Sequence, residues 1–168
     1  PGFDIASFWS RAGLARLFPP KTVDPFVLRT AFGDHVTSIA ASSAINAALV
    51  GRFKTGKGRL VEASLLRAGL YTVGSDFAIQ LFFDRLASTK ERHEAIVPIT
   101  NFFKSKDDAW ICLVARQGNV DWPRICRAVD ANDLLEDERF ERSKGRRTHA
   151  KELVEGLDAA FGRFTKDE

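Results

Sequence analysis

The chain has 168 residues, 45% of them hydrophobic and 28% charged, which is enough for one good core or two small ones. Apolar stretches are interrupted well before a membrane-spanning length, so we expect a soluble globular protein. Two cysteines are too few for a disulfide framework or a metal site, so we expect a reducing compartment, the cytoplasm. The formal net charge of +3 suits an anionic ligand but is equally ordinary for such a protein. Since the chain starts at Pro1 and has no methionine, we expect a piece of a longer protein, and an organelle matrix stays open as its compartment.

Residues 3–18 form the first apolar run, which has helical spacing and stops at Pro19-Pro20. Its aromatic side chains are expected in the core or at a subunit contact. The next helix is predicted at about 34–53, because apolar and small side chains recur along one stripe. Such small side chains let another backbone approach closely, so this helix should be buried among neighbours.

Gly56 and Gly58 permit a tight turn after this helix, and residues 60–63 read as a short strand. Ser64 is the kind of residue that caps a helix. The apolar spacing behind it predicts a single helix that runs to about Leu86.

A polar stretch, 88–94, makes a plausible domain boundary and divides the chain into 1–90 and 91–168. In the second part, two strand-like runs at 96–103 and 109–115 flank a polar turn and predict an antiparallel hairpin.

Two further helices are predicted, one from Trp122 with Pro123 in its first turn and one over 153–164. Cys112 falls in a predicted strand and Cys126 on an apolar helix face, so both are expected to be small core residues. The fold class is therefore mixed α/β, with a helix-rich segment followed by a small α+β domain that carries the hairpin.

Asp34 is the candidate catalytic residue, because it stands where the helix at 34–53 begins. There the unpaired backbone N–H groups and the positive end of the helix dipole favour an ionised carboxylate. Capping the helix is the commoner task for an aspartate in such a place. Position alone leaves both roles open.

The surrounding residues resemble the family III CoA-transferases, the CaiB/BaiF group. The resemblance covers nearly the whole chain and is carried by Pro1-Gly2-Phe3-Asp4, Asp34, a small-residue helix ending in Ala48-Leu49 and Arg52, Thr55-Gly56-Lys57-Gly58-Arg59, Ser64-Leu65-Leu66, Trp122-Pro123, Asp137-Glu138-Arg139-Phe140 and Arg146.

The resemblance implies that residues 1–90 are part of a large, nucleotide-fold-like domain and that Asp34 is the nucleophile. It further implies an enzyme that moves CoA between an acyl-CoA and a carboxylic acid through an enzyme-bound anhydride and an aspartyl-CoA thioester. Coenzyme A would then be part of the substrate, with no tightly bound cofactor and no metal. Members of the family form interlocked homodimers, so a homodimer is expected here too.

The runner-up within the family is 2-methylacyl-CoA racemisation, which needs a pair of proton-transferring groups. Racemases have Gly-His-Asp where this chain has Gly2-Phe3-Asp4, and Phe3 cannot move a proton. The formate-specific branch has a glycine-rich loop that matches 90–98, a stretch without glycine here, so a formyl or oxalyl group is not expected.

Other classes of function are weaker. Gly51 to Gly58 fits part of a phosphate loop, but it follows a helix and opens a strand, which is the inverse of the required context. A basic run at 142–151 could meet nucleic-acid phosphates, but four neighbouring acidic residues cancel much of its field, so neither nucleic acid nor a membrane is expected as a partner. The three histidines are too far apart to form a recognisable metal set.

Overall fold

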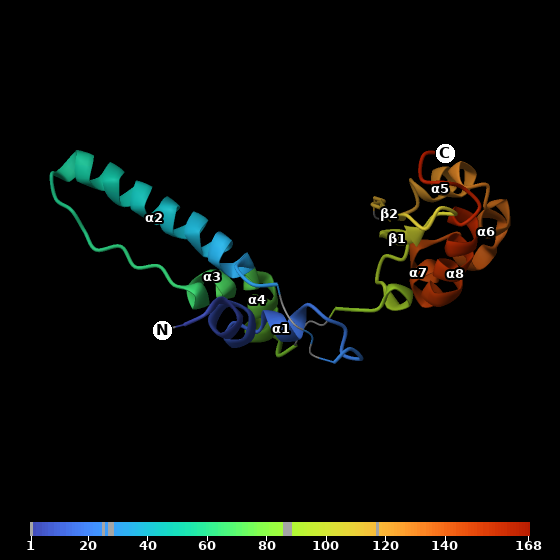
Figure 1. Ribbon diagram of the computed structural model, residues 1–168. Coiled ribbons are helices and arrows are strands. Elements are labelled where there is room, and N and C mark those ends of the chain that lie inside the picture. Colours follow the sequence, from blue (N-terminus) through green and yellow to red (C-terminus); the bar gives the residue numbers. More distant parts are fainter. Residues whose placement is uncertain (1, 25, 27–28, 86–88, 117) are drawn as a thin grey trace. The chain divides into compact units, whose positions relative to one another are not determined.

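The computed structural model describes residues 2–24, 26, 29–85, 89–116 and 118–168. The chain divides into two compact units, Pro1–Thr89 and Lys90–Glu168, and each is described by itself (Figure 1). The first unit is helical and the second contains helices and a two-stranded antiparallel sheet, which confirms the expected mixed fold class. None of the helices among the described residues is long and apolar enough to cross a membrane.

The first unit begins with two short helical segments where one run was predicted. The π-helical η1 (Ile5–Arg11) and the short α1 (Leu14–Leu17) are separated at Gly13, whose φ of 91° lies in the left-handed region that glycine adopts readily. The chain thus turns between the two segments instead of continuing as one helix.

Helices α2 (Phe32–Thr55), α3 (Leu65–Thr72) and α4 (Gly74–Phe83) complete the first unit. The single helix predicted after Ser64 is interrupted at Val73. Its predicted end, Leu86, lies outside the described residues, as does Ser88, the first residue of the predicted domain boundary. Ser64 caps α3 as expected, because its hydroxyl accepts a hydrogen bond from the backbone N–H of Arg67 at 3.2 Å.

The core of the first unit lies where η1 packs on α3. It consists of Phe8, Trp9, Ala12, Leu14, Ala68 and Val73. Gly69 permits the close approach, since a Cβ there would lie 2.6 Å from the Cβ of Ala12. The expectation of buried aromatics is correct for Phe8 and Trp9, whereas Phe3 is 78% exposed.

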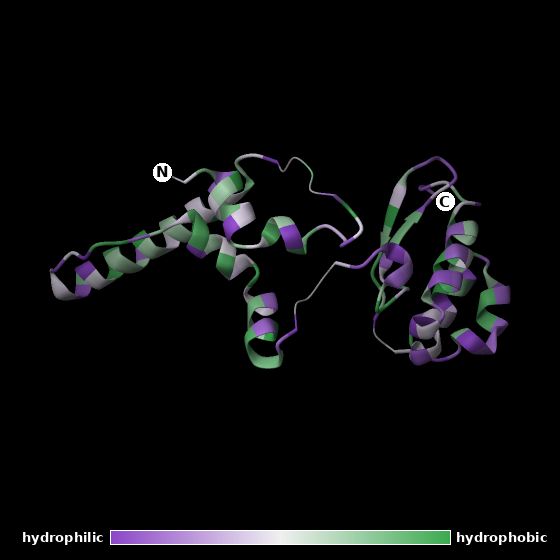
Figure 2. Ribbon diagram, turned by 90° about the horizontal axis from the view of Figure 1, so that it is seen from below, coloured by the Kyte–Doolittle hydropathy of each residue, from purple (hydrophilic) through white to green (hydrophobic). Residues whose placement is uncertain are grey.

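Helix α2 does not have the burial that its small residues predict. Gly33 is its one buried residue, and apolar side chains are exposed along its length, from Ile39 at 73% to Phe53 at 93%. The hydropathy colouring of the ribbon shows that hydrophobic residues recur along this long helix (Figure 2). Residues 57–64 return from its far end in an extended conformation (Figure 1). The strand predicted at 60–63 is absent from this described stretch, because a strand needs a partner to form its ladder of hydrogen bonds.

The second unit is built around a short hairpin. Strands β1 (Asn101–Lys104) and β2 (Trp110–Leu113) pair antiparallel, with Asn101 opposite Leu113 and Lys104 opposite Trp110. The hairpin is confirmed, although both strands are shorter than predicted. The remaining elements are η2 (Arg92–Glu94), α5 (Trp122–Ala128), α6 (Asn132–Glu136), η3 (Glu138–Phe140), α7 (Ser143–Thr148) and α8 (Ala150–Phe161).

The core of this second unit is larger than that of the first. Phe103 of β1 stacks on Phe161 of α8 with ring centroids 4.8 Å apart. Around this pair lie buried side chains from α5 and the residue that follows it, from η3 and from α8, namely Trp122, Ile125, Cys126, Val129, Phe140, Leu153, Val154, Leu157 and Ala160. Both helices predicted here, from Trp122 and around Leu157, therefore form and bury their apolar faces.

The two cysteines differ in environment, which corrects the expectation that both are core residues. Cys126 is buried and burial raises the pKa of its thiol to about 12, whereas Cys112 is exposed because its strand turns that side chain outward. We predict that a thiol reagent at pH 8 modifies Cys112 in the folded protein and reaches Cys126 only in denaturant. Peptide mapping of the labelled protein checks this, and Cys112→Ser should remove the native-state labelling. Equal labelling of both cysteines in the native protein would contradict it.

Candidate functional site

Asp34 lies in the first turn of α2 and is exposed to solvent. It is the third helical residue, after Phe32 and Gly33, and the N-cap position is occupied by Ala31. Asp34 is therefore not the capping residue that its sequence position suggested. Among the described residues no side chain bonds to its carboxylate or forms an ion pair with it, so the group is available at the positive end of a 24-residue helix.

A second aspartate, Asp4, holds the start of α2. Its Oδ1 accepts a hydrogen bond from the backbone N–H of Gly33 at 3.1 Å, although the two residues are 29 apart in sequence. Asp4 is 7% exposed. Gly33 has to be a glycine, since a Cβ there would collide with Asp4 Oδ1 and with the Phe8 side chain. The sequence placed Asp4 in a family motif but gave no sign of this contact.

A cavity of about 640 Å³ opens beside α2 in the first unit. It lies between the small side chains of α2 and the facing residues of the 62–64 segment and α3, including Arg67 and Tyr71. Its volume is in the range of small-molecule sites, and its lining is mainly apolar. Asp34 is not among the lining residues, although Val36 and Thr37 from the next turn are.

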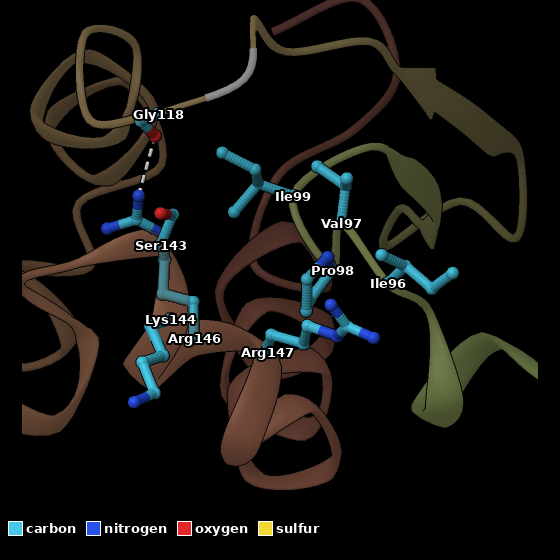
Figure 3. A pocket seen from close by; sticks show the side chains of 9 residues that line it. All are labelled: Ile96, Val97, Pro98, Ile99, Gly118, Ser143, Lys144, Arg146 and Arg147. Atoms are coloured by element: carbon cyan, nitrogen blue, oxygen red, sulfur yellow. Dashed lines mark hydrogen bonds between the residues drawn. The ribbon is translucent and has the colours of Figure 1, made fainter.

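The second unit has a smaller pocket of about 380 Å³ that is lined by apolar and basic residues (Figure 3). Residues 96–99 form one wall, and Ser143, Lys144 and Arg147 come from α7. No acidic residue is among those that line it. Such a lining can accept an anion that also has an apolar part.

Arg146 is the residue whose role the sequence missed most clearly. In the sequence it was placed within the basic run at 142–151 and in the family resemblance, yet it is only 1% exposed. Its Nη1 donates to the carbonyls of Phe140 at 2.6 Å and Glu141 at 3.0 Å, and its Nη2 donates to the Gly118 carbonyl at 2.6 Å and Asn119 Oδ1 at 2.7 Å.

The guanidinium of Arg146 also lies over the ring of Trp122, 5.3 Å from its centroid. Burial lowers the pKa of the guanidinium. Arg146 therefore joins the loop before α5, the α5 helix and the η3 segment, and it acts as a structural centre of the second unit.

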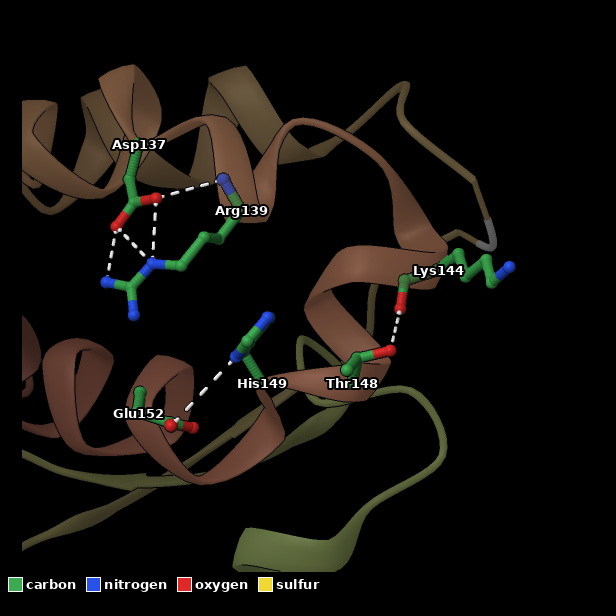
Figure 4. Close-up of polar contacts among 6 residues, drawn as sticks. All are labelled: Asp137, Arg139, Lys144, Thr148, His149 and Glu152. Carbon is green, nitrogen blue, oxygen red and sulfur yellow. Dashed lines mark hydrogen bonds and ion pairs between the residues drawn. The ribbon is translucent and has the colours of Figure 1, made fainter.

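Acidic side chains lie beside part of this basic surface (Figure 4). Arg139 Nη2 lies 2.6 Å from Asp137 Oδ2, and hydrogen bonds from Arg139 lower the pKa of Asp137. His149 Nδ1 lies 4.0 Å from Glu152 Oε1. This mixture of signs is typical of a solvated surface and does not resemble a phosphate-binding stripe.

A pH-sensitive contact lies at the start of α5. Arg116 donates to Asp121 from its guanidinium at 2.6 Å and from its backbone N–H at 2.8 Å, and these bonds lower the pKa of the Asp121 carboxyl to about 2. Because the pKa of this carboxyl is lower in the folded than in the unfolded protein, its ionised form stabilises the fold, and this stabilisation is fully present above the unfolded pKa of about 3.9. It is lost as the pH falls from about 4 through the folded pKa of about 2.

We therefore predict that the Asp121 carboxyl titrates with a midpoint of about 2 when followed by NMR. Asp121→Asn should reduce the acid dependence of unfolding between about pH 4 and pH 2, because the amide does not titrate there. A midpoint near that of a free aspartate would contradict the prediction.

Comparison with known proteins agrees with this fold. In the solved structure of a CaiB/BaiF family protein from Brucella suis, the superposition has a TM-score of 0.84 at 19% identity and covers 99% of this chain and 43% of that one. The chain is 28% identical to (R)-2-hydroxy-4-methylpentanoate CoA-transferase from Clostridioides difficile, over 100% of this chain and 42% of that protein. It is 29% identical to succinyl-CoA:glutarate CoA-transferase from Homo sapiens, over 95% of this chain and 36% of that protein.

The architecture is thus that of a CaiB/BaiF protein. The profile of CoA-transferase family III matches residues 1–168, and the chain belongs to that family. The resemblance inferred from the sequence is confirmed. The chain spans about two-fifths of the length of the curated relatives it matches.

Proposed function

We propose that the protein transfers CoA from an acyl-CoA to a carboxylic acid and that Asp34 is the nucleophile. The observation that carries the proposal is an exposed carboxylate in the first turn of a long helix, without a side-chain partner in the part of the chain that the structure describes, in a chain of CoA-transferase family III. The relatives named above are CoA-transferases, which supports the class of reaction. Coenzyme A enters as part of the substrate, so no tightly bound cofactor is required.

The chemistry suits a carboxylate, because an aspartate is ionised at neutral pH and needs no general base. Asp34 attacks the thioester carbonyl, the C–S bond breaks, and the CoA thiolate leaves behind a mixed anhydride. The thiolate then attacks the Asp34 carbonyl, which releases the first carboxylic acid and forms an aspartyl-CoA thioester. The acceptor carboxylate then attacks the Asp34 carbonyl of this thioester, which releases the CoA thiolate and forms a second anhydride between Asp34 and the acceptor. The thiolate attacks the acceptor carbonyl of that anhydride, which forms the new acyl-CoA and releases the free Asp34 carboxylate.

The helix dipole contributes only a small part of the acceleration. Its effect on a charge in the first turn is about 0.3–1 kcal/mol, or at most roughly fivefold in rate. Orientation of the carboxylate and donors to the developing oxyanion must supply the rest.

The assembly is part of the same proposal. Exposed apolar residues along α2, among them Ile45, Val50 and Phe53, form a surface that suits coverage by a second copy in a homodimer.

The proposal is tested by mass spectrometry of the intact protein incubated with acyl-CoA substrates. A peptide containing Asp34 should carry an acyl or CoA adduct, and hydroxylamine should remove it. Exchange of the α-proton with solvent, with loss of configuration and without CoA transfer, would instead indicate the racemase of the same family.

A further inference from the structure

Helix α2 begins without a local cap. Its N-cap residue is Ala31, which has no side chain able to accept a hydrogen bond and which has a φ of 66°. That left-handed conformation is unfavourable for alanine. The helix with the candidate nucleophile therefore starts at a strained residue, where a serine or asparagine would have capped it locally.

Asp4 makes the contact that the N-cap residue lacks. Its Oδ1 accepts from the N–H of Gly33, the second residue of α2, across 29 positions of sequence. The other oxygen, Oδ2, is buried and has no hydrogen-bond partner among the described residues. Burying a carboxylate that is only half satisfied is unfavourable, and a neutral side chain would make the same single contact with less cost.

Packing fixes Asp4 in place. It immediately precedes η1, whose Phe8 is completely buried. The ring of Phe8 lies against that of Phe32, the first residue of α2, with centroids 6.1 Å apart. The first turn of α2 is thus held at Phe32 by an aromatic contact and at Gly33 by the Asp4 carboxylate.

We propose that Asp4 is a positioning residue for Asp34, acting through the Gly33 backbone. This inference rests on the proposed function, in which Asp34 is the nucleophile. Gly33 and Asp34 are consecutive in the first turn, where helices fray most readily. By anchoring the Phe32–Gly33 peptide group, one residue before the nucleophile, Asp4 fixes the direction in which the Asp34 carboxylate is presented.

The test uses the intact protein and four variants: Asp4→Ala, Asp4→Asn, Asp34→Asn and, as a control, Asp76→Asn. Asp76 is an aspartate in the first turn of α4 in the same unit. For each variant the single-turnover rate of adduct formation on the Asp34 peptide and the KM for acyl-CoA are measured. Circular dichroism establishes that the fold is retained.

We expect Asp4→Ala to slow adduct formation by about 10- to 100-fold with little change in KM, because displacing a reacting group by about 1 Å has effects of that size. Asp4→Asn, which keeps an oxygen for the Gly33 N–H, should stay within about threefold of the wild type, since asparagine and aspartate cap helices about equally well. Asp76→Asn should match the wild type. If Asp4→Ala does not fold, Asp4→Leu takes its place, because it removes the acceptor for the Gly33 N–H but keeps the side-chain volume, and it is expected to slow adduct formation by the same factor.

The outcomes separate this inference from the proposed function. An active wild-type enzyme with no adduct on Asp34 would refute the proposed function. A normal adduct whose rate is unchanged in folded Asp4→Ala would refute only the positioning role. A large loss in folded Asp4→Asn would also refute it, because the hydrogen bond to Gly33 would then not be what matters.

Discussion

Asp34→Asn is expected to lower CoA transfer by at least about a thousandfold while the protein stays folded. The neutral amide cannot attack a thioester or form the anhydride, so the first covalent step is lost. The fold should survive because Asp34 is exposed and is not the N-cap of α2. Loss of the interaction between the carboxylate and the helix dipole should lower the free energy of unfolding by only about 0.3–1 kcal/mol. Steady-state CoA transfer and urea unfolding measure the two effects.

Two comparisons make this result specific. Asp34→Ala guards against slow deamidation of the asparagine, which would regenerate the aspartate and mimic residual activity. Asp76→Asn removes the same charge from another first turn and should leave transfer unchanged. Transfer near the wild-type rate in both Asp34 variants would show that the nucleophile lies elsewhere.

Local patterns predicted most of the helices and the hairpin correctly. Apolar spacing located α2 and α8, Pro123 marked the first turn of α5, and Ser64 was recognised as a cap. Each of these features depends on residues within a few positions of one another, which is the range over which sequence patterns report structure.

The contacts that shape the candidate site are not local. The bond from Gly33 to Asp4 spans 29 residues, and nothing in either short motif indicates that the two meet. The same holds for Arg146, whose partner Gly118 lies 28 residues away. A sequence shows that such residues are polar, but not that folding will bury them.

For helix α2, the sequence predicted the type of surface but not the element that packs against it. Its small residues correctly indicate a surface that another element can approach closely, but they do not say which element does so. Within the first unit, η1 and α3 contact only part of it. The strand expected at 60–63 is missing from the described residues for a related reason, since β-propensity is expressed only beside a partner strand.

Arg146→Ala is expected to destabilise the second unit by more than about 3 kcal/mol, because the change leaves several acceptors unsatisfied and opens a void beside Trp122. That is a large share of the 5–15 kcal/mol that stabilises a typical domain. Arg146→Lys should recover only part of the loss, since one ammonium group cannot reproduce the planar fork that reaches four acceptors.

Hydrogen exchange followed by mass spectrometry measures this loss unit by unit. Protection of α5 and α8 should fall in Arg146→Ala, while protection of η1 and α3 in the first unit should not change. The matched control is Arg147→Ala, which removes the adjacent but exposed cation and should alter stability by less than about 0.5 kcal/mol. If Arg146→Ala and Arg147→Ala lowered stability by equally small amounts, the buried guanidinium would contribute no more to the fold than a surface charge does. The structural role assigned to Arg146 would then be refuted.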